Sequence, residues 1–183
     1  YGGTSGTGGG GGTIYLQHTG HAAGAGKVIV DYGNITPGDR AVSVTYQNGR
    51  DASAYAFSEI VLTNGGVYAL GTNDTLTITS ATIRPDPTGA YDGISIAGGT
   101  LLIPPGFTYS NYVIGIRSPS SIFAPTPSLT VLTNATLTID VPFTLNCPLV
   151  IGPGGNVNHS ANNATETYKL TLTVNGNLEV QAG

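Results

Sequence analysis

The stretch from Ser128 to Ile151 shows a long alternation of apolar and polar positions. Its odd positions are apolar except for Thr133, and polar residues or prolines fill most of its even positions. A strand points successive side chains to opposite faces, so this pattern predicts one inward face held in phase. Pro142 and Pro148 interrupt backbone pairing without shifting the phase. Because the stretch far exceeds a usual strand of about 5–6 residues, it predicts a chain that coils around a core.

Short strand signals separated by Gly, Asn and Pro recur along the rest of the chain. Three of them are similar: TLTIT at 75–79, TLTID at 136–140 and LTLTV at 170–174. In a parallel solenoid like residues stack on like residues in successive coils. We therefore predict an all-β fold, a parallel β-helix (solenoid) with irregular coils, and keep a β-sandwich as the alternative. One irregular helical turn is expected within 52–62, and a long loop within 118–127.

Composition supports strands and excludes several partners. Charged residues make up 9% of the 183 residues, against about 25% in an ordinary globular protein, which leaves little to build solvated helix faces. The formal net charge is −4, and the six basic residues are spread singly, so no basic stripe is present for nucleic acid. No apolar run approaches the roughly 20 residues that cross a bilayer. We expect neither a nucleic-acid partner nor a membrane span.

The length fits one domain, which we place at 13–183, preceded by a Gly-rich N-terminal segment at 1–12. That segment, YGGTSGTGGGGG, is either a flexible tether or an ordered coil packed against the solenoid. It lacks the GKS or GKT ending of a phosphate-binding loop. The chain begins at Tyr1 and contains no Met, so we expect a processed form or a segment of a longer protein.

Candidate catalytic and metal-binding residues are sparse. Polysaccharide lyases and hydrolases need clustered carboxylates, and the nearest approach to a cluster is Arg84, Asp86 and Asp92 around one turn. We expect turn residues there, no catalytic or cofactor site and no enzyme activity. His18 and His21 have no Cys, Asp or Glu nearby in sequence, so no metal site is predicted; calcium, which accepts loop oxygens, is the one cofactor kept open. The single cysteine lies on the inward face, where we expect a buried thiol.

Two surface features suit an exposed role. The chain contains five Asn-x-Ser/Thr sequons, and those in the polar region after the long alternation are the best candidates for glycosylation. The Thr-x-Thr pairs of the three similar strands would form a flat ladder if they aligned, as an ice-binding surface requires. The candidate glycosylation sites are Asn158 and Asn163; the other sequons begin at Asn34, Asn73 and Asn134.

The order of the Gly-rich segment and the short strands along the chain is similar to that of a known class of proteins. GTGGGGGTIYLQ followed by GKVIVDYGN, then strands of the TLTI, GTL and LTV type ending in VNGNLEV, resembles the Gly-rich right-handed parallel β-helix regions of very large secreted bacterial surface proteins. The resemblance covers most of the chain and rests on composition and rhythm. It implies a right-handed coil and an extracellular or cell-surface, adhesin-like or filament-like structural role. It implies no functional residue.

These observations lead to one functional hypothesis and two alternatives. The chain is expected to be a structural subunit or segment of a fibre or adhesin, which self-associates or continues a longer chain through exposed strand ends. The first alternative is a polysaccharide-binding or polysaccharide-cleaving β-helix with converged acids and aromatic platforms at Tyr91, Tyr109 or Tyr112. The second is an ice-binding or glycan-binding module. The expected assembly residues are Tyr1, Ile14, Leu16, Leu172, Val174, Leu178 and Val180.

Overall fold

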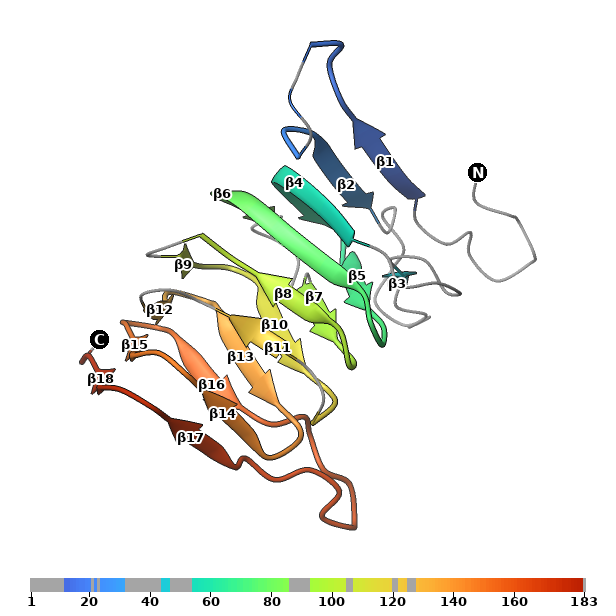
Figure 1. Ribbon diagram of the computed structural model, residues 1–183. Helices are drawn as coiled ribbons and strands as arrows, with labels where there is room; N and C mark the ends of the chain where they lie inside the picture. Colours follow the sequence, from blue (N-terminus) through green and yellow to red (C-terminus); the bar gives the residue numbers. More distant parts are fainter. Residues whose placement is uncertain are drawn as a thin grey trace.

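The computed structural model describes residues 12–20, 22, 24–31, 44–46, 54–85, 93–104, 107–119, 122–124 and 128–182, with the side chains of 44–46, 80–85 and 122–124 left aside. In these ranges the chain is all-β, without a helix, and its mostly parallel strands stack as a β-solenoid of about 4 turns. The predicted solenoid is therefore confirmed, and the β-sandwich is not the fold (Figure 1). The interpretation of Tyr1–Gly12 falls outside the described residues except at Gly12, the first residue of a strand.

Three walls surround the core, and the chain visits them in the same order in each turn. The first wall carries β8 (Thr100–Leu102), β11 (Ile122–Ala124), β14 (Phe143–Leu145) and β17 (Leu172–Val174). The second wall carries β9 (Thr108–Tyr109), β12 (Leu129–Val131), β15 (Leu149–Ile151) and β18 (Leu178–Val180). The third wall carries β3 (Val44–Tyr46), β5 (Val67–Leu70), β7 (Gly93–Ile96), β10 (Val113–Ile116), β13 (Thr136–Ile139) and β16 (Asn156–Asn158).

The early turns use longer strands. β4 (Ala54–Thr63) and β6 (Thr75–Pro85) are 10 and 11 residues long and pair with each other in parallel on both sides of a register shift. The first part of β6 pairs with β8, whereas the second part of β4 pairs with β2 (Lys27–Asp31). β1 (Gly12–Leu16) then pairs with β2 in the antiparallel sense and is the end strand of that sheet. β1, β2, β4 and β6 therefore belong to the six-stranded sheet that ends with the first-wall strands β8 and β11.

The helical turn expected within 52–62 is wrong, because β4 is a strand with a register shift between Phe57 and Glu59. The inward residues of β4 are Phe57, Ile60 and Leu62. Phe57 and Ile60 lie three positions apart, at the point where the register against β6 shifts, and this spacing imitates a helical period. The loop expected at 118–127 is likewise interrupted, by β11.

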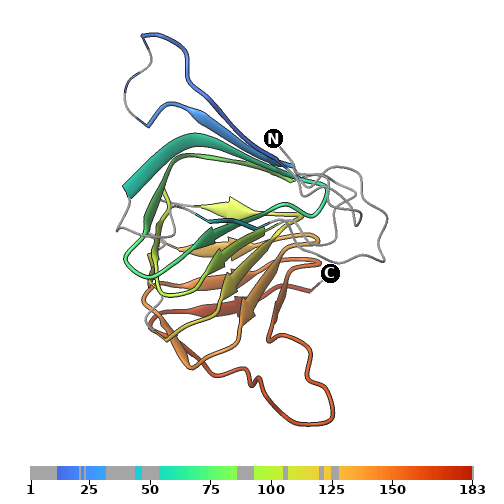
Figure 2. The same cartoon turned by 90° about the vertical axis from the view of Figure 1, so that its right-hand side faces the viewer.

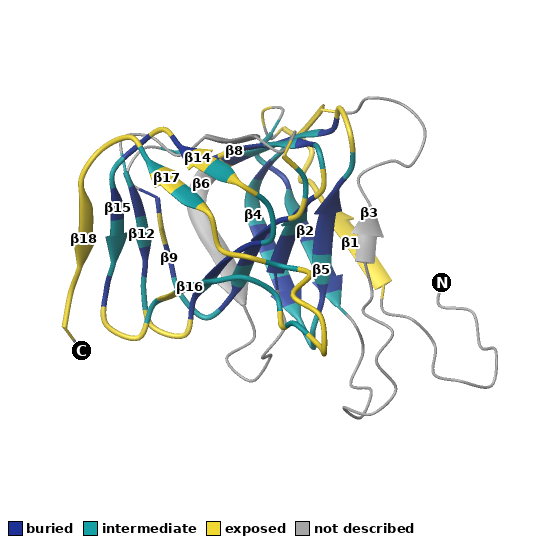
Figure 3. Cartoon of the chain, turned by 90° about the horizontal axis from the view of Figure 1, so that it is seen from below, coloured by how far each residue is buried: buried dark blue, intermediate teal, exposed yellow. Residues whose placement is uncertain are grey.

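The long alternation is confirmed as the inward face of the last turns. Its odd residues are buried or packed against the core, and Thr133, the one polar exception, is exposed. Pro142 is exposed at a corner, so the phase survives the break in pairing. Figure 3 shows the buried residues, in dark blue, along the strands of the stack. The fully buried residues of the stretch are Leu129, Val131, Ala135, Leu137, Ile139, Leu145 and Leu149, with Cys147 nearly so.

The corner between the second and third walls is tight and repeats. Asn64, Asn111 and Asn134 stand there with φ of 55°, 59° and 57°, and Gly154 follows with 72°. Asn is the residue that, after Gly, adopts this left-handed backbone at least cost. The Asn134 amide also donates to Asn111 Oδ1 at 3.1 Å, which joins two turns. This short corner keeps the inward face in phase from one turn to the next.

Candidate functional site

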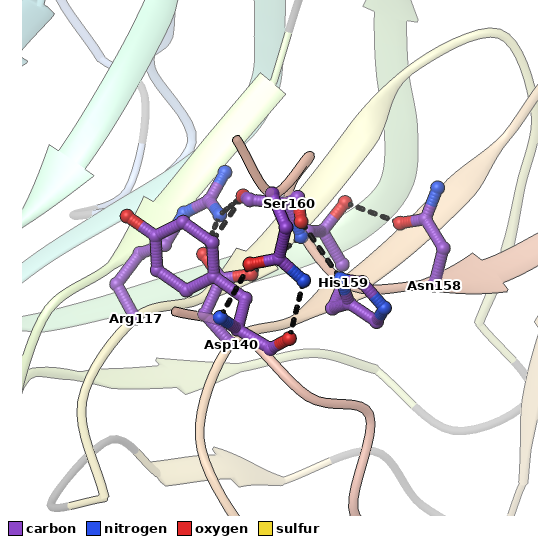
Figure 4. A network of polar contacts seen from close by, with 8 residues as sticks. Arg117, Asp140, Asn158, His159 and Ser160 are labelled. Atoms are coloured by element: carbon purple, nitrogen blue, oxygen red, sulfur yellow. Dashed lines mark hydrogen bonds and ion pairs between the residues drawn. The ribbon is translucent and has the colours of Figure 1, made fainter. Parts of the chain in front are cut away.

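A polar cluster stands at the corner between the third and first walls. Arg117, Asp140 and Ser160 come from three successive turns, just after β10, β13 and β16. The strand register places them one above another, because Ile116 pairs with Ile139 and Thr138 pairs with Asn158. We call these three residues the polar corner (Figure 4).

Every polar side chain of this corner is engaged. The Arg117 guanidinium forms an ion pair with Asp140 and donates to Ser160 Oγ at 2.5 Å. The backbone N–H of Ser160 donates to Asp140 Oδ1 at 2.7 Å, and its hydroxyl donates to Oδ2 at 2.9 Å. The Asp140 side chain is only 6% exposed, whereas that of Arg117 is 35% exposed. The contacts therefore tie three turns together around one buried carboxylate.

The surroundings of Asp140 favour its ionised form. Burial alone would raise the pKa of this carboxyl, but the hydrogen bonds from Ser160 and Arg117, together with the charge of Arg117, hold the pKa below its ordinary value. His159 Nδ1 lies 2.7 Å from the carbonyl oxygen of Ser160, not from the hydroxyl. A fully bonded carboxylate and a hydroxyl that donates to it suit a structural joint better than a base and nucleophile.

The polar corner anchors the loop 159–171, which leads from β16 to β17. Inside the loop, Asn162 Oδ1 accepts the backbone N–H groups of Thr167 and Tyr168 at 2.8 and 2.7 Å. Asn162 Nδ2 donates to the carbonyl of Tyr168 at 2.7 Å. Figures 1 and 2 both show this loop projecting beyond the last strands, at the end of the stack opposite β1.

The two candidate glycosylation sites have different surroundings. Asn163 and Thr165 are exposed within the projecting loop. Asn158 is half-buried, its Oδ1 accepts a hydrogen bond from Thr138 at 3.1 Å, and its sequon serine, Ser160, belongs to the polar corner. Only the first site presents both sequon side chains to solvent in the folded chain.

The turn at 84–92, the nearest approach to an acidic cluster in the sequence and expected to hold turn residues, is not tested by the structure. Asp86 and Asp92 lie outside the described residues, as does the side chain of Arg84. Sequence reasoning missed the pairing of Asp140 with Arg117, since the two residues lie 23 positions apart and only the coil register places them together. Within the described ranges no group of three or more His, Cys, Asp and Glu side chains is placed to hold a metal ion.

The suggested aromatic platforms are corrected. Tyr109 and Tyr112 are core residues with exposures of 2% and 3%. Their ring centroids lie 4.8 Å apart, and burial raises the pKa of both phenols. Neither ring can therefore stack on an outside ligand, and Tyr91 lies outside the described residues.

The Thr pairs do not form one flat ladder. Thr75 and Thr77 belong to β6, and the next strand on that wall places Leu102 beside Thr77. Thr136 and Thr138 lie on the third wall, where Thr138 is 7% exposed. An ice-binding face of the predicted kind is therefore not assembled by these residues.

The last turn leaves part of the inward row uncovered. Leu149 is fully buried, but its partner Leu178 in the next turn is 58% exposed. Val180, the partner of Ile151, is 70% exposed. Leu172 and Val174 of β17 are half-buried. Four of the predicted assembly residues thus line the same end of the core.

β1 lies at the opposite end and is exposed, as its yellow colour in Figure 3 shows. Ile14, Tyr15 and Leu16 are 53%, 51% and 51% exposed. Tyr15 shares the inner face with Val28 and lies 5.6 Å from the ring of Phe57. Ile14 and Leu16 pair with the outward-facing residues of β2. The predicted assembly residues of β1 therefore lie on the outer face, and Tyr1 falls outside the described residues.

Comparisons complete the description of the chain. Within the described ranges no helix has the length and apolar character of a membrane span. No protein-family model, curated protein or solved structure matches this sequence.

Proposed function

We propose that this chain is a structural subunit or segment of an extracellular or cell-surface fibre or adhesin, and that it assembles through its exposed strand ends. The observation that carries the proposal is the uncovered inward row of the last turn. Leu178 and Val180 stand in register with core residues, yet more than half of each side chain is exposed. Covering apolar surface of this kind stabilises a contact by about 25 cal/mol per Å².

The groups that an uncovered last turn exposes indicate what kind of partner it binds. The end strands of the three walls present backbone N–H and C=O groups together with apolar side chains, and another β-strand satisfies both. The partner is therefore a further β-coil, supplied by a second copy or by a longer chain. An extracellular location rests on the resemblance to Gly-rich surface proteins; a glycan, where the host attaches one, would sit at Asn163 rather than Asn158.

The test measures assembly and compares the two faces of one strand. Light scattering over a range of concentrations, with negative-stain electron microscopy, should show ordered filaments of the wild-type chain. Leu178→Asp places a charge in the uncovered row and should abolish them, whereas Glu179→Gln, on the outer face of the same strand, should leave them intact. Repeating the measurement with a chelator tests for calcium at the joints.

Wild-type chains that stay monomeric at every concentration would overturn self-assembly. Filaments unaffected by Leu178→Asp would show that the contact lies elsewhere. Circular dichroism of each variant, recorded at a concentration below assembly, checks that the fold is retained.

A further inference from the structure

We infer, on the basis of the proposed function, that filaments of this chain pair side by side through the outer face of β1, β2 and the part of β4 that pairs with β2 (Glu59–Thr63). We call this surface the lateral face. Its occupant is the lateral face of a second copy, turned by a two-fold rotation. Such a contact is isologous, because the same residues meet on both sides. It is separate from the strand ends, since it lies on the side of the stack.

An apolar row crosses the middle of the lateral face. Ile14 of β1 pairs with Ile29 of β2, and Ile29 pairs with Val61 of β4, so the three residues stand in line on neighbouring strands (Figure 1). They point away from the core, since Val28 and Val30 on either side of Ile29 are buried. Ile14 is 53% exposed, and Ile29 and Val61 are half-buried. A contiguous apolar patch with a polar rim is typical of a protein interface.

Opposite charges flank the apolar row on its central strand. On the outer face of β2, Lys27 precedes Ile29 and Asp31 follows it. Lys27 forms an ion pair with Glu59 at 3.4 Å, and Asp31 accepts a hydrogen bond from Asn64 at 2.7 Å. An ammonium group has three N–H donors and a carboxylate has several lone pairs. Each of the two charged groups can therefore bind a further partner from a second copy.

The order of these charges selects the orientation of the second copy. A two-fold axis along the apolar row reverses the strand direction, so Lys27 of each copy faces Asp31 of the other while the apolar row faces itself. A two-fold axis parallel to the strands would instead place Lys27 opposite Lys27 and Asp31 opposite Asp31, which like-charge repulsion disfavours. Of the two face-to-face rotations, the charges therefore select the one that keeps the coil axes of both copies parallel.

The same rotation matches a large side chain with a small one. Leu16 and Gly12 lie on the outer face of β1, on either side of Ile14. The rotation places Leu16, which is 51% exposed, opposite Gly12 of the second copy. A Cβ added at Gly12 would meet no atom within 4 Å, so the leucine side chain enters open space. Beyond Val61 the register brings Arg84 of β6, and the apolar row ends there.

The size of the lateral face explains why the contact acts between filaments. It comprises three strand segments of five residues each, which at a spacing of about 4.8 Å and a rise of about 3.4 Å per residue cover about 250 Å². A stable complex of two separate proteins buries about 800 Å² on each partner, so a single contact is weak. A filament presents the lateral face once in every copy, and the repeated contacts reinforce one another.

Two charge reversals test both the pairing and its orientation. Lys27→Asp and Asp31→Lys are each assembled alone, and negative-stain electron microscopy counts paired and single filaments. Each variant alone places like charges opposite each other, so the fraction of paired filaments should fall by about tenfold or more below the wild type. Mixing preformed filaments of the two variants should restore the pairs, because each reversed charge then faces its opposite on the other variant.

Two further variants separate the lateral face from general effects. Ile29→Thr removes the centre of the apolar row, keeps a β-branched side chain and should also lower the paired fraction. Thr144→Asp is the matched control, since Thr144 is exposed on the outer face of β14, in a different sheet, and it should leave the pairs intact. Circular dichroism of each variant checks that the fold is retained.

The outcomes separate this inference from the proposed function. Wild-type filaments that all stay single would overturn the lateral pairing while leaving assembly in place. Pairs that persist in both charge variants and in Ile29→Thr would show that the contact uses another face. Pairs that are lost in each charge variant but do not return on mixing would contradict the two-fold orientation. A wild-type chain that forms no filaments would overturn the proposed function, and the paired filaments with it.

Discussion

Leu149 and Leu178 stand at the same place in successive turns, yet the first is fully buried and the second is 58% exposed. Their strands share one wall and one register. The difference arises from what covers them: β18 covers β15, and no strand of the described chain covers β18. The burial of a residue in a solenoid is therefore a property of its turn within the stack. An apolar residue of the last described turn is exposed because no further strand of the described chain covers it.

The largest expected difference between the two turns is the stability lost when each of these leucines is truncated to alanine. Leu149→Ala removes a fully buried side chain and should lower the free energy of unfolding by about 3 kcal/mol, since the tight core can collapse only partly around the cavity. Leu178→Ala should lower it by less than about 1 kcal/mol. Chemical denaturation at a concentration where the chain is monomeric measures both.

A conservative substitution at position 149 controls for general disturbance of the strand. Leu149→Met keeps most of the volume and should cost less than about 1.5 kcal/mol. Equal losses for the two alanine variants would mean that the last turn is covered in solution, and the contrast between the turns would then disappear.

A medium-sized effect is expected at the polar corner, which joins the middle turns to the last one. Asp140→Asn removes the charge that Arg117 and Ser160 hold. It should cost about 1–2 kcal/mol at neutral pH, because solvent screens the partly exposed guanidinium. The pKa of Asp140 is lower in the folded chain than its ordinary value of 3.8, so the wild type gains this stability above that value. The gain is lost as the pH falls through the lowered pKa.

Denaturation of both proteins between neutral and strongly acidic pH measures this gain. The difference in unfolding free energy should shrink toward zero at the acid end. Asn175→Ala in the last turn removes no titratable group and provides the matched control, because its difference from the wild type should not change with pH. A difference that stays constant across the range would mean that the charge of Asp140 contributes nothing to the joint.

The sequence predicts the phase of this fold better than its register. The alternation from Leu129 to Leu149 identifies the inward residues, since each one faces the core whatever stands above it. Register depends on corner length, which varies: Thr138 bonds to Asn158, 20 positions later, whereas Asn175 bonds to Asn146, 29 positions earlier. The polar corner needs that register, and so sequence reasoning missed it.

Two other predictions, the helical turn within 52–62 and the tyrosine platforms, were also wrong because they rested on local sequence alone. The bulge after Phe57 imitates a helical spacing, and only the pairing of β4 with its neighbours reveals a strand. Tyr109 and Tyr112 suggested a binding platform because tyrosine is common at such surfaces. Both rings instead face the core, where Phe107 and Tyr109 also stack at 6.2 Å.

The smallest effect is expected from the asparagines that join successive turns. Asn134 has a left-handed backbone, with φ of 57°, and its amide bonds to Asn111. Asn134→Ala should cost about 1 kcal/mol, because alanine adopts this conformation less readily, whereas Asn134→Gly should cost less despite losing the same hydrogen bond. Asn175 bonds to Asn146 at 2.8 Å in an exposed position, so Asn175→Ala should change stability by no more than about 0.5 kcal/mol. Thermal unfolding ranks the three variants. If glycine proved as costly as alanine at position 134, the side-chain hydrogen bond, and not the backbone conformation, would account for the stability of this corner. Asn134 of the middle turns and Asn175 of the last turn would then both stabilise the stack through their side-chain hydrogen bonds.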